Sequence, residues 1–222
     1  MGILTGILYG NNIRAVLDDK AGINLGSVYE SVVASELTAH GYKLFYYDNR
    51  HKGEMDYLID DYATLSAIPI EVKSGKDYTI LIDYAHTPDS MVNVLQTVKE
   101  FAKGRTVAVF GCGGDRDKTK RPRMGKAAAD WSDFAVVTTD NPRTEEPAAI
   151  IRDILPGFDG SNTPYEVVED RVEAIRWAMD HAQKDDVIVL CGKGHETYQE
   201  VNHQKFHMDE REIVAEHLNS GR

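Results

Sequence analysis

The sequence predicts an α/β protein whose larger, second part folds into a mostly parallel sheet covered by helices on both faces. From about residue 79 onward, short apolar runs rich in β-branched residues alternate with amphipathic stretches, and this alternation is typical of parallel sheets with crossover helices. Four of the apolar runs end in a polar or glycine-rich loop, as expected where strands carry a binding site at their carboxyl ends. Before residue 79, a helix pattern followed by three strand patterns predicts a smaller α/β part.

The first segment, residues 1–78, carries charged residues within its predicted helix and strands. Residues 26–40 carry valine and leucine at helical spacing and end before a glycine, which predicts an amphipathic helix. Strands are predicted at 43–47, 55–59 and 68–72. Glu30 lies on the helix, Asp56 within the second strand, and Glu71 and Lys73 on one face of the third. Carboxylates converging from a helix and two strands would bind a divalent cation such as magnesium, while the lysine orients a water or stabilises a phosphoryl charge.

Three motifs of this segment, GSVYESVVASEL, GEMDYLI and IPIEVKSGK, resemble the PD-(D/E)XK nuclease-like superfamily, and more closely the nuclease-like domain at the C-terminal end of certain AAA-type ATPases. The resemblance covers about the first 76 residues. It implies a catalytic cluster of Glu30, Asp56, Glu71 and Lys73, with Asp56 and Glu71 on the metal and nucleic acid as a partner of this part alone. The alternative is a degenerate domain whose charges only solvate an edge strand. The ATPase motif GxxxxGK(S/T) does not occur in the chain.

The second segment, residues 79–222, alternates strands and helices. Its apolar runs are short and bounded by glycine, proline or charged residues, which predicts strands joined by crossover helices rather than hairpins. The expected strands are 80–83, 106–110, 135–138, 165–168 and 187–191, and the expected helices are 90–102, 124–131, 147–155 and 171–182.

The most informative loop is the end of VVTTDNPR. Pro142 fixes its own φ and biases Asn141 away from helix, so the polar residues are expected on a stiff, extended turn. Asp140 can hold an ammonium group and Arg143 can grip a carboxylate through two hydrogen bonds, a combination that suits a zwitterionic amino acid. The alternative is an ordinary strand-to-helix turn with a surface ion pair.

Two further loops offer groups for a nucleotide. In DYAHTPDS, Asp83 and His86 suit ribose hydroxyls and a phosphate or metal-bound water, or else form a capped turn before a helix. In GCGGDRD, the glycines let backbone N–H groups approach an anion while Arg116 supplies charge. A basic run follows at 118–123, either as a solvated face or close to a phosphate.

The fourth loop, GKGHE, pairs a flexible backbone with a carboxylate. Gly192 begins the loop and Glu196 ends it. Glu196 could bind a second ammonium group, and the alternative is a plain glycine-rich turn.

Together, DYAHTPDS, FGCGGDRDKTKRP, TTDNPR and GKGHETYQ, in that order, resemble the C-terminal domain of the Mur ligases, most closely the meso-diaminopimelate-adding members of that family. The resemblance spans nearly all of residues 79–222 and implies a Rossmann-like sheet. It also implies ATP and magnesium as cofactors and meso-diaminopimelate or a muropeptide precursor as the partner. The residues that would hold diaminopimelate are Arg116, Asp140, Asn141, Pro142, Arg143, Gly192 and Glu196, with Asp83 and His86 beside the nucleotide.

The composition of the chain limits where the protein is expected to be located and which partners it is expected to bind. The chain has 222 residues, of which 42% are apolar and 27% charged, and its formal net charge of -11 argues against a general electrostatic grip on nucleic acid. No apolar run is long enough to span a bilayer and no signal-peptide pattern begins the chain, so the expected location is the cytoplasm, without a membrane partner. Cys112 and Cys191 are expected to be reduced and buried.

Three functions remain open at this stage. The first is the amino-acid-binding domain of a diaminopimelate-adding ligase in peptidoglycan precursor synthesis, joined at SGKDYT/ILIDYAH to the nuclease-like piece in a fusion, natural or engineered. It would not ligate alone, because the phosphate-binding domain supplies positioning and charge stabilisation. The second is a magnesium-dependent nuclease on a Mur-like scaffold, and the third is a folding chimera without activity. The sequence does not indicate an oligomeric state.

Overall fold

The computed structural model describes residues 44–49, 53–61, 66–74 and 78–220, the first three ranges by their backbone alone. The chain divides into two compact units, Met1–Ser74 and Gly75–Arg222. The helix predicted at 26–40 lies outside the described residues. No helix in the described ranges is long and apolar enough to cross a membrane.

The first unit contains an antiparallel sheet of three strands. Its strands are β1 (Leu44–Asn49), β2 (Gly53–Asp61) and β3 (Ser66–Ser74). β2 pairs with β1 on one side and with β3 on the other, and the register with β1 shifts between Phe45 and Tyr47. The three predicted strands are therefore confirmed, each longer than its apolar run.

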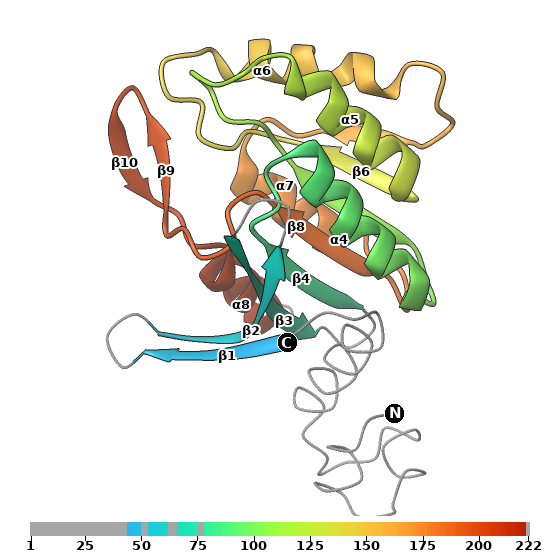
Figure 1. Cartoon of the computed structure of the whole chain (residues 1–222), viewed down its shortest axis with the longest axis vertical. Helices are drawn as coiled ribbons and strands as arrows, with labels where there is room; N and C mark the ends of the chain where they lie inside the picture. Colours follow the sequence, from blue (N-terminus) through green and yellow to red (C-terminus); the bar gives the residue numbers. More distant parts are fainter. Residues whose placement is uncertain (1–43, 50–52, 62–65, 75–77, 221–222) are drawn as a thin grey trace, which may run out of the picture. The chain divides into compact units, whose positions relative to one another are not determined.

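The second unit is built on a parallel sheet, so the predicted fold class is confirmed. Its strands, in spatial order, are β4 (Thr79–Asp83), β8 (Val187–Cys191), β5 (Thr106–Phe110), β6 (Phe134–Val137) and β7 (Tyr165–Val167). Every neighbouring pair is parallel. β5 and β8 are buried along their whole length, which explains their unbroken apolar sequences. Because the strands are parallel, the loops after β4, β5, β6 and β8 leave the same edge of the sheet (Figure 1).

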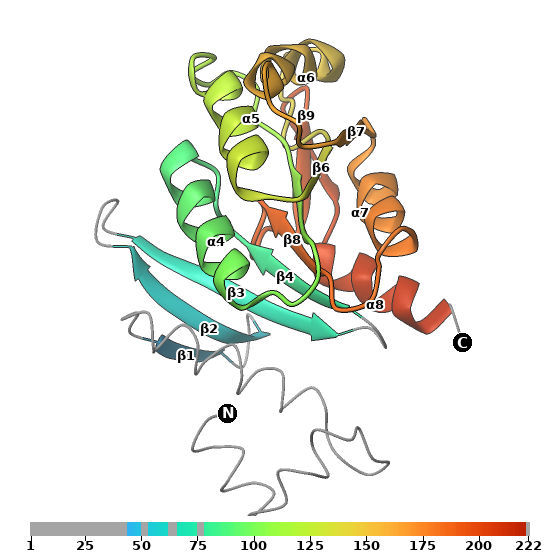
Figure 2. The same cartoon turned by 90° about the vertical axis from the view of Figure 1, so that its right-hand side faces the viewer.

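Helices cover both faces of this sheet, as Figure 2 shows. On one face lie α4 (Pro88–Phe101) and α5 (Lys120–Trp131), which pack against each other. On the other lie α7 (Arg171–Asp180) and α8 (Glu210–Ser220). α6 (Pro147–Ile154) continues into a 3-10 turn, Leu155–Phe158, and both pack against α5.

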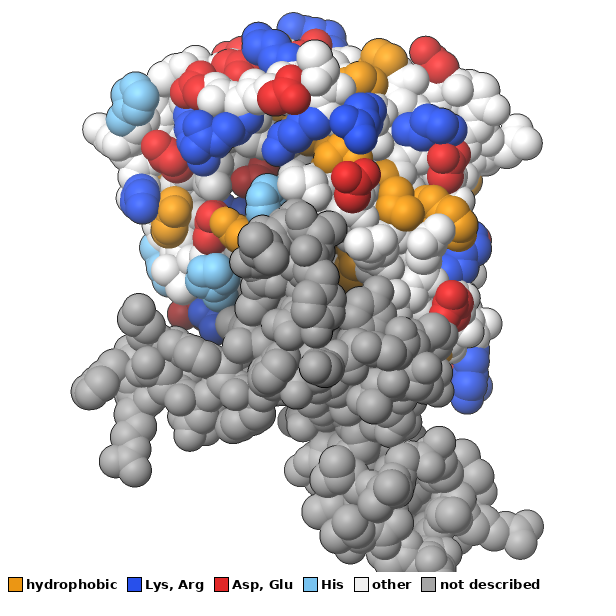
Figure 3. Space-filling model, in the orientation of Figure 1, with side chains coloured by type: hydrophobic (Ala, Val, Ile, Leu, Met, Phe, Trp, Pro, Cys, Tyr) orange, Lys and Arg blue, Asp and Glu red, His pale blue; other side chains and the backbone are white. Residues whose placement is uncertain are grey.

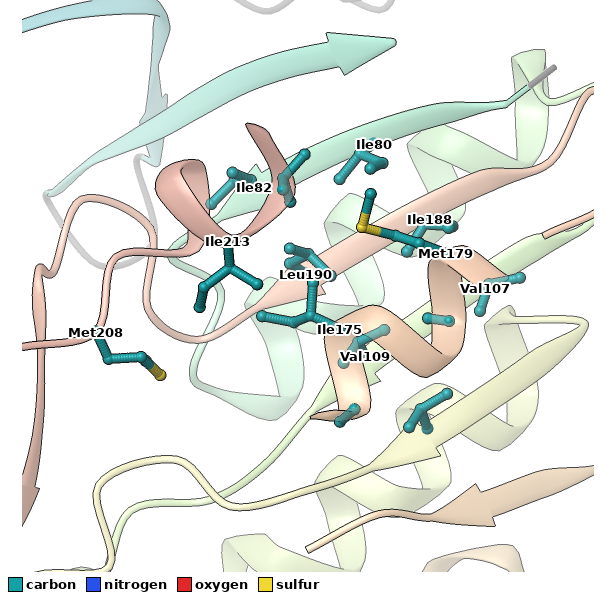
Figure 4. Packing of buried hydrophobic residues seen from close by; sticks show 14 residues of the cluster. Ile80, Ile82, Val107, Val109, Ile175, Met179, Ile188, Leu190, Met208 and Ile213 are labelled. Carbon is teal, nitrogen blue, oxygen red and sulfur yellow. The ribbon is translucent and has the colours of Figure 1, made fainter. Parts of the chain in front are cut away.

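The hydrophobic core follows from the alternation of side chains along the strands. Ile80 and Ile82, Val107 and Val109, and Ile188 and Leu190 belong to one buried cluster with Ile175 and Met179 of α7 and Ile213 of α8 (Figure 4). The residues between them, such as Leu81, Ala108 and Val189, are also buried and face the opposite helices. Both cysteines are free and buried, as expected.

The structure differs from the sequence-based elements in several places, and one of them is α8, where no helix was predicted. α5 begins at Lys120 rather than at 124, because its first turn is basic and its one buried residue there is Arg121, which an apolar pattern cannot show. A two-stranded hairpin, β9 (Tyr198–Val201) and β10 (Gln204–His207), was not predicted. Its turn residues Asn202 and His203 both have positive φ, yet the glycine that usually marks such a turn is missing.

Candidate functional site

The four loops that follow β4, β5, β6 and β8 meet at one edge of the sheet. Lys120 Nζ donates to His86 O over 3.1 Å, which joins the first loop to the second. Arg143 Nη1 donates to Gly114 O over 2.8 Å, which joins the second to the third. Asn141 Nδ2 donates to Glu196 Oε2 over 3.0 Å, which joins the third to the fourth. The expected gathering of the loops is therefore present as direct contacts.

The DNPR loop was predicted to be a stiff, extended turn, and the structure shows that it is not extended throughout. Arg143 has φ 51°, a left-handed conformation that is unfavourable for a residue with a side chain. Its backbone N–H donates to Glu200 O over 3.0 Å, and its carbonyl accepts from Asn202 N over 2.7 Å. These two bonds to the β9–β10 hairpin hold the turn in a shape that the sequence did not predict.

Asn141 is buried and its amide is fixed by three partners. Oδ1 accepts from Lys193 Nζ over 2.9 Å and from Glu200 N over 2.8 Å, while Nδ2 donates to Glu196. This pattern determines which end of the amide is the donor. The second Nδ2 hydrogen has no acceptor within residues 78–220.

Lys193 is a buried cation of the site. Its Nζ donates to Asn141 Oδ1, to Glu196 Oε2 over 2.9 Å and to Tyr198 O over 2.5 Å, so its three hydrogens are used. The ammonium group of Lys193 thus balances the negative charge of Glu196 at Oε2. Its Oε1 lies 3.5 Å from Tyr84 Oη and remains the oxygen that can accept from a ligand.

Asp140 is held against the glycine that begins the fourth loop. Gly192 has φ 117°, and a Cβ at that position would lie 2.6 Å from Asp140 Oδ2. Asp140 is 7% exposed, and its carboxylate receives no hydrogen bond from the described part of the chain. The site therefore presents a nearly buried carboxylate beside a backbone that only glycine allows to approach.

Arg116 lies on the second loop and is exposed. Its Nη1 donates to the carbonyl of Asp115 over 3.1 Å. A Cβ at Gly113 would meet Arg143 Nη1 at 2.9 Å and Arg116 Cγ at 3.8 Å. The two arginine side chains therefore run past the same glycine, and Arg116 is the more exposed of the two.

The basic run that follows is largely neutralised by the protein itself. Arg121 is fully buried and binds Glu145 Oε1 over 2.7 Å and Asp153 Oδ2 over 2.8 Å. Lys118 also binds Glu145 over 3.0 Å. Hydrogen bonds from Arg121 and Lys118 lower the pKa of Glu145 to about 2. Basic and acidic side chains are accordingly mixed over the upper part of the face shown in Figure 3.

The loop after β4 holds a carboxylate of a different kind. Asp83 is 1% exposed, its Oδ1 accepts from Ala85 N over 2.6 Å, and its Oδ2 has no partner among the described residues. Burial raises its pKa to about 7. His86 is exposed, with Nδ1 2.8 Å from Tyr84 O. The cap of α4 is Thr87, in a capping box with Ser90, so Asp83 does not serve as the helix cap.

The charged residues of the first unit are described less fully. Glu30 lies outside the described residues. Asp56 lies on β2 and Glu71 and Lys73 on β3, and these two strands pair with each other. Among residues 78–220, whose side chains the structure describes, no group of three His, Cys, Asp or Glu could hold a metal ion.

Sequence reasoning missed Lys193 and Glu200. Lys193 lies between two glycines, a context that indicates a flexible loop, and Glu200 lies in a hairpin that was not predicted. The one available signal was the position of Lys193 within GKGHE, three residues before the carboxylate that it binds.

Comparisons with protein families divide the chain in two. Residues 70–194 match the model of the Mur ligase, glutamate ligase domain. Residues 25–83 match a domain of unknown function, DUF4143. This second match gives no support to the nuclease interpretation of Glu30, Asp56, Glu71 and Lys73 or to a nucleic-acid partner.

Individual relatives agree with the first match. The chain is 54% identical over 147 residues to a UDP-N-acetylmuramoyl-L-alanyl-D-glutamate--2,6-diaminopimelate ligase of Caldanaerobacter subterraneus subsp. tengcongensis, covering 66% of the chain and 30% of the relative. It is 56% identical over 141 residues to the same kind of ligase of Clostridium perfringens, covering 64% and 29%. A solved structure of a ligase of that name has a TM-score of 0.65 at 30% identity, covering 81% of the chain and 45% of that structure. The chain thus spans about 30% of the length of the curated relatives.

Proposed function

Because the chain belongs to the Mur ligase family through its glutamate ligase domain, we propose that its second unit is the amino-acid-binding domain of a UDP-N-acetylmuramoyl-L-alanyl-D-glutamate--2,6-diaminopimelate ligase. In this proposal it acts in peptidoglycan precursor synthesis and binds meso-diaminopimelate. Relatives more than 50% identical carry this name. The free, buried cysteines fit a reducing compartment such as the cytoplasm.

The observation that carries the proposal is the pairing of opposite charges across the meeting loops. Diaminopimelate has two ammonium and two carboxylate groups. Asp140 and Glu196 Oε1, which accepts one long hydrogen bond from Tyr84 Oη, can accept from ammonium groups, while Arg143 and Arg116 can donate to carboxylates. Each proposed group therefore has a counterpart of opposite charge within one cluster of loops.

Arg143 is equipped for this role because its partners leave donors free. A guanidinium has five N–H donors. Arg143 uses one on Nη1 for Gly114 O, and its Nε lies 3.2 Å from Glu200 Oε2. Among the described residues, the second hydrogen on Nη1 and both hydrogens on Nη2 have no acceptor, and a carboxylate that binds through both Nη atoms uses one hydrogen of each.

The family resemblance also implies ATP and magnesium, and the residues present fit these groups only in part. Asp83 offers an unpartnered buried oxygen and His86 an exposed ring near the same loop, so both could contact a nucleotide. No three-ligand metal cluster exists among the described residues, and the sequence holds no GxxxxGK(S/T). We therefore assign the domain the tasks of binding the amino acid and orienting its amine, and propose that it does not ligate alone.

Isothermal titration of the purified chain with meso-diaminopimelate tests the proposal. We expect saturable binding that is weakened at least about tenfold in Arg143→Ala, a loss of roughly 1.4 kcal/mol, while L-lysine, which lacks the second carboxylate, binds more weakly to the unmodified chain. Equal binding of both amino acids, or an unchanged affinity in Arg143→Ala, would overturn the assignment of Arg143. ATP-dependent peptide formation by the purified chain would overturn the proposal that it does not ligate alone.

A further inference from the structure

Strand β9 lies along the DNPR loop and contacts each of its charged or amide residues. Gln199 Nε2 donates to Asp140 O over 2.8 Å, and Glu200 N donates to Asn141 Oδ1 over 2.8 Å. Arg143 forms a parallel bridge with Val201. The hairpin therefore acts on the loop as an added strand, although the two segments are more than fifty residues apart in sequence.

Glu200 holds Arg143 through both its backbone and its side chain. Its carbonyl accepts the backbone N–H of Arg143, and its Oε2 lies 3.2 Å from Arg143 Nε. The side chains are 17% exposed for Arg143 and 22% for Glu200. An ion pair that is mostly shielded from water restricts the guanidinium more than a surface pair does.

The position of this ion pair decides which side of the guanidinium a ligand can reach. A carboxylate can bind an arginine through Nε and one Nη, or end-on through both Nη atoms. Glu200 occupies the Nε side and Gly114 O takes one hydrogen of Nη1. The second Nη1 hydrogen and both Nη2 hydrogens have no acceptor among the described residues, so they remain for a ligand.

We infer that Glu200 is a positioning residue that fixes Arg143 for the second carboxylate of a diaminopimelate-type amino acid, and thereby sets selectivity over amino acids that lack this carboxylate. This inference rests on the proposed function. Removing the Glu200 side chain frees the Nε side of the guanidinium, so Arg143 can rotate away from the end-on arrangement. Alanine and glutamine keep the backbone N–H and carbonyl of residue 200, so these variants test the side chain alone.

The test is a titration of the unmodified chain and its variants with meso-diaminopimelate and with L-lysine. Glu200→Ala should lower the affinity for meso-diaminopimelate about tenfold and leave that for L-lysine within about twofold. Glu200→Gln should recover most of the loss, because its amide oxygen can take the place of Oε2 beside Arg143 Nε. Gln204→Ala, at an exposed position of the partner strand β10, is the control and should change neither affinity.

Comparing Glu200→Ala with and without Arg143→Ala distinguishes positioning of Arg143 from a general effect of Glu200 on the fold. In the Arg143→Ala background, Glu200→Ala should have no further effect on meso-diaminopimelate, because Glu200 acts through that arginine. A loss of the same size in both backgrounds, or an unchanged selectivity in Glu200→Ala, overturns the inference. If the unmodified chain binds neither amino acid, the proposed function fails and this inference fails with it. If the unmodified chain binds meso-diaminopimelate selectively and Glu200→Ala binds it with the same affinity and selectivity, the inference is overturned while the proposed function stands.

Discussion

Lys193 Nζ and Asn141 Oδ1 lie 2.9 Å apart, with the lysine side chain fully buried and the asparagine 5% exposed. The same ammonium group binds Glu196 Oε2 and the carbonyl of Tyr198. One side chain therefore links the DNPR loop, the GKGHE loop and the β9–β10 hairpin. The geometry of the proposed amino-acid site depends on this link.

Lys193→Met should lower the free energy of unfolding by about 2 kcal/mol or more, because it removes the ammonium group that neutralises Glu196 and leaves Glu196 Oε2 and Asn141 Oδ1 with one donor each. Glu196 keeps some contact with water, which places the loss below that of a fully buried pair. Denaturant unfolding measures the change. Lys184→Met, at an exposed position, is the control, and equal stabilities for the two variants would contradict the role assigned to Lys193.

Asp83→Asn should change how stability depends on pH. Burial raises the pKa of Asp83 from 3.8 to about 7, so the folded chain holds a proton there that the unfolded chain releases at lower pH. The stabilisation is complete below pH 3.8 and is lost as the pH rises through about 7. Asparagine stays neutral, so the variant should lose less stability than the parent between pH 5 and pH 8, by an amount on the order of 2 kcal/mol.

Chemical unfolding of both proteins at these two pH values measures this difference. Asparagine keeps an oxygen that can accept from Ala85 N, so the local turn is preserved. If the free energy of unfolding changes equally with pH in the parent and in Asp83→Asn, Asp83 is ionised in the folded chain at neutral pH.

Gly192→Ala should lower the free energy of unfolding by more than the backbone strain of an alanine at positive φ alone, and it should also disturb the site. Gly192 and Gly160 both have positive φ, at 117° and 77°. A Cβ at 192 meets Asp140 Oδ2 at 2.6 Å, whereas a Cβ at 160 meets nothing within 4 Å. Gly160→Ala should therefore cost about 1 kcal/mol from backbone strain alone, and Gly192→Ala should cost more and also weaken binding of meso-diaminopimelate.

Thermal or denaturant unfolding of the two alanine variants, followed by titration, separates strain from crowding. Equal losses of stability together with unchanged affinity in Gly192→Ala would mean that Asp140 moves away without consequence.

Arg121→Met should destabilise the fold by roughly 2–3 kcal/mol, because Glu145 and Asp153 lose a fully buried partner. Lys118 binds the same Glu145 but is 66% exposed, so Lys118→Met should cost less than about 0.5 kcal/mol. Denaturant unfolding of both variants tests the contrast. Similar values for the two would show that burial of Arg121 does not govern its contribution.

The sequence predicted most of the second unit because its strands are buried on both faces. Continuous apolar runs such as Val187–Cys191 reveal a parallel strand without any knowledge of its neighbours. The β9–β10 hairpin escaped prediction because β10 is exposed along its length and its turn lacks glycine. The first turn of α5 escaped it because the inward residue is an arginine.

The loops of the site were predictable, but the bonds between them were not. Parallel topology alone places four loop starts on one edge, so Asp140, Arg143 and Glu196 could be grouped from the sequence. The pairing of Glu196 with Lys193 and of Arg143 with Glu200 depends on side-chain directions in loops. Neither the periodicity nor the spacing of residues in the sequence carries that information. The alternative interpretation of GKGHE as a plain glycine-rich turn overlooked its buried lysine.

The most direct measurement is a two-dimensional NMR titration of the isotope-labelled chain with meso-diaminopimelate. If the loops form the amino-acid site, saturable shifts should concentrate at the amides of Asn141, Arg143, Gly192 and Glu196, and L-lysine should leave the Arg143 side-chain signal unmoved. Shifts that gather elsewhere, for example on α6, or no shifts up to roughly millimolar ligand, would contradict the assignment of this edge of the sheet to diaminopimelate.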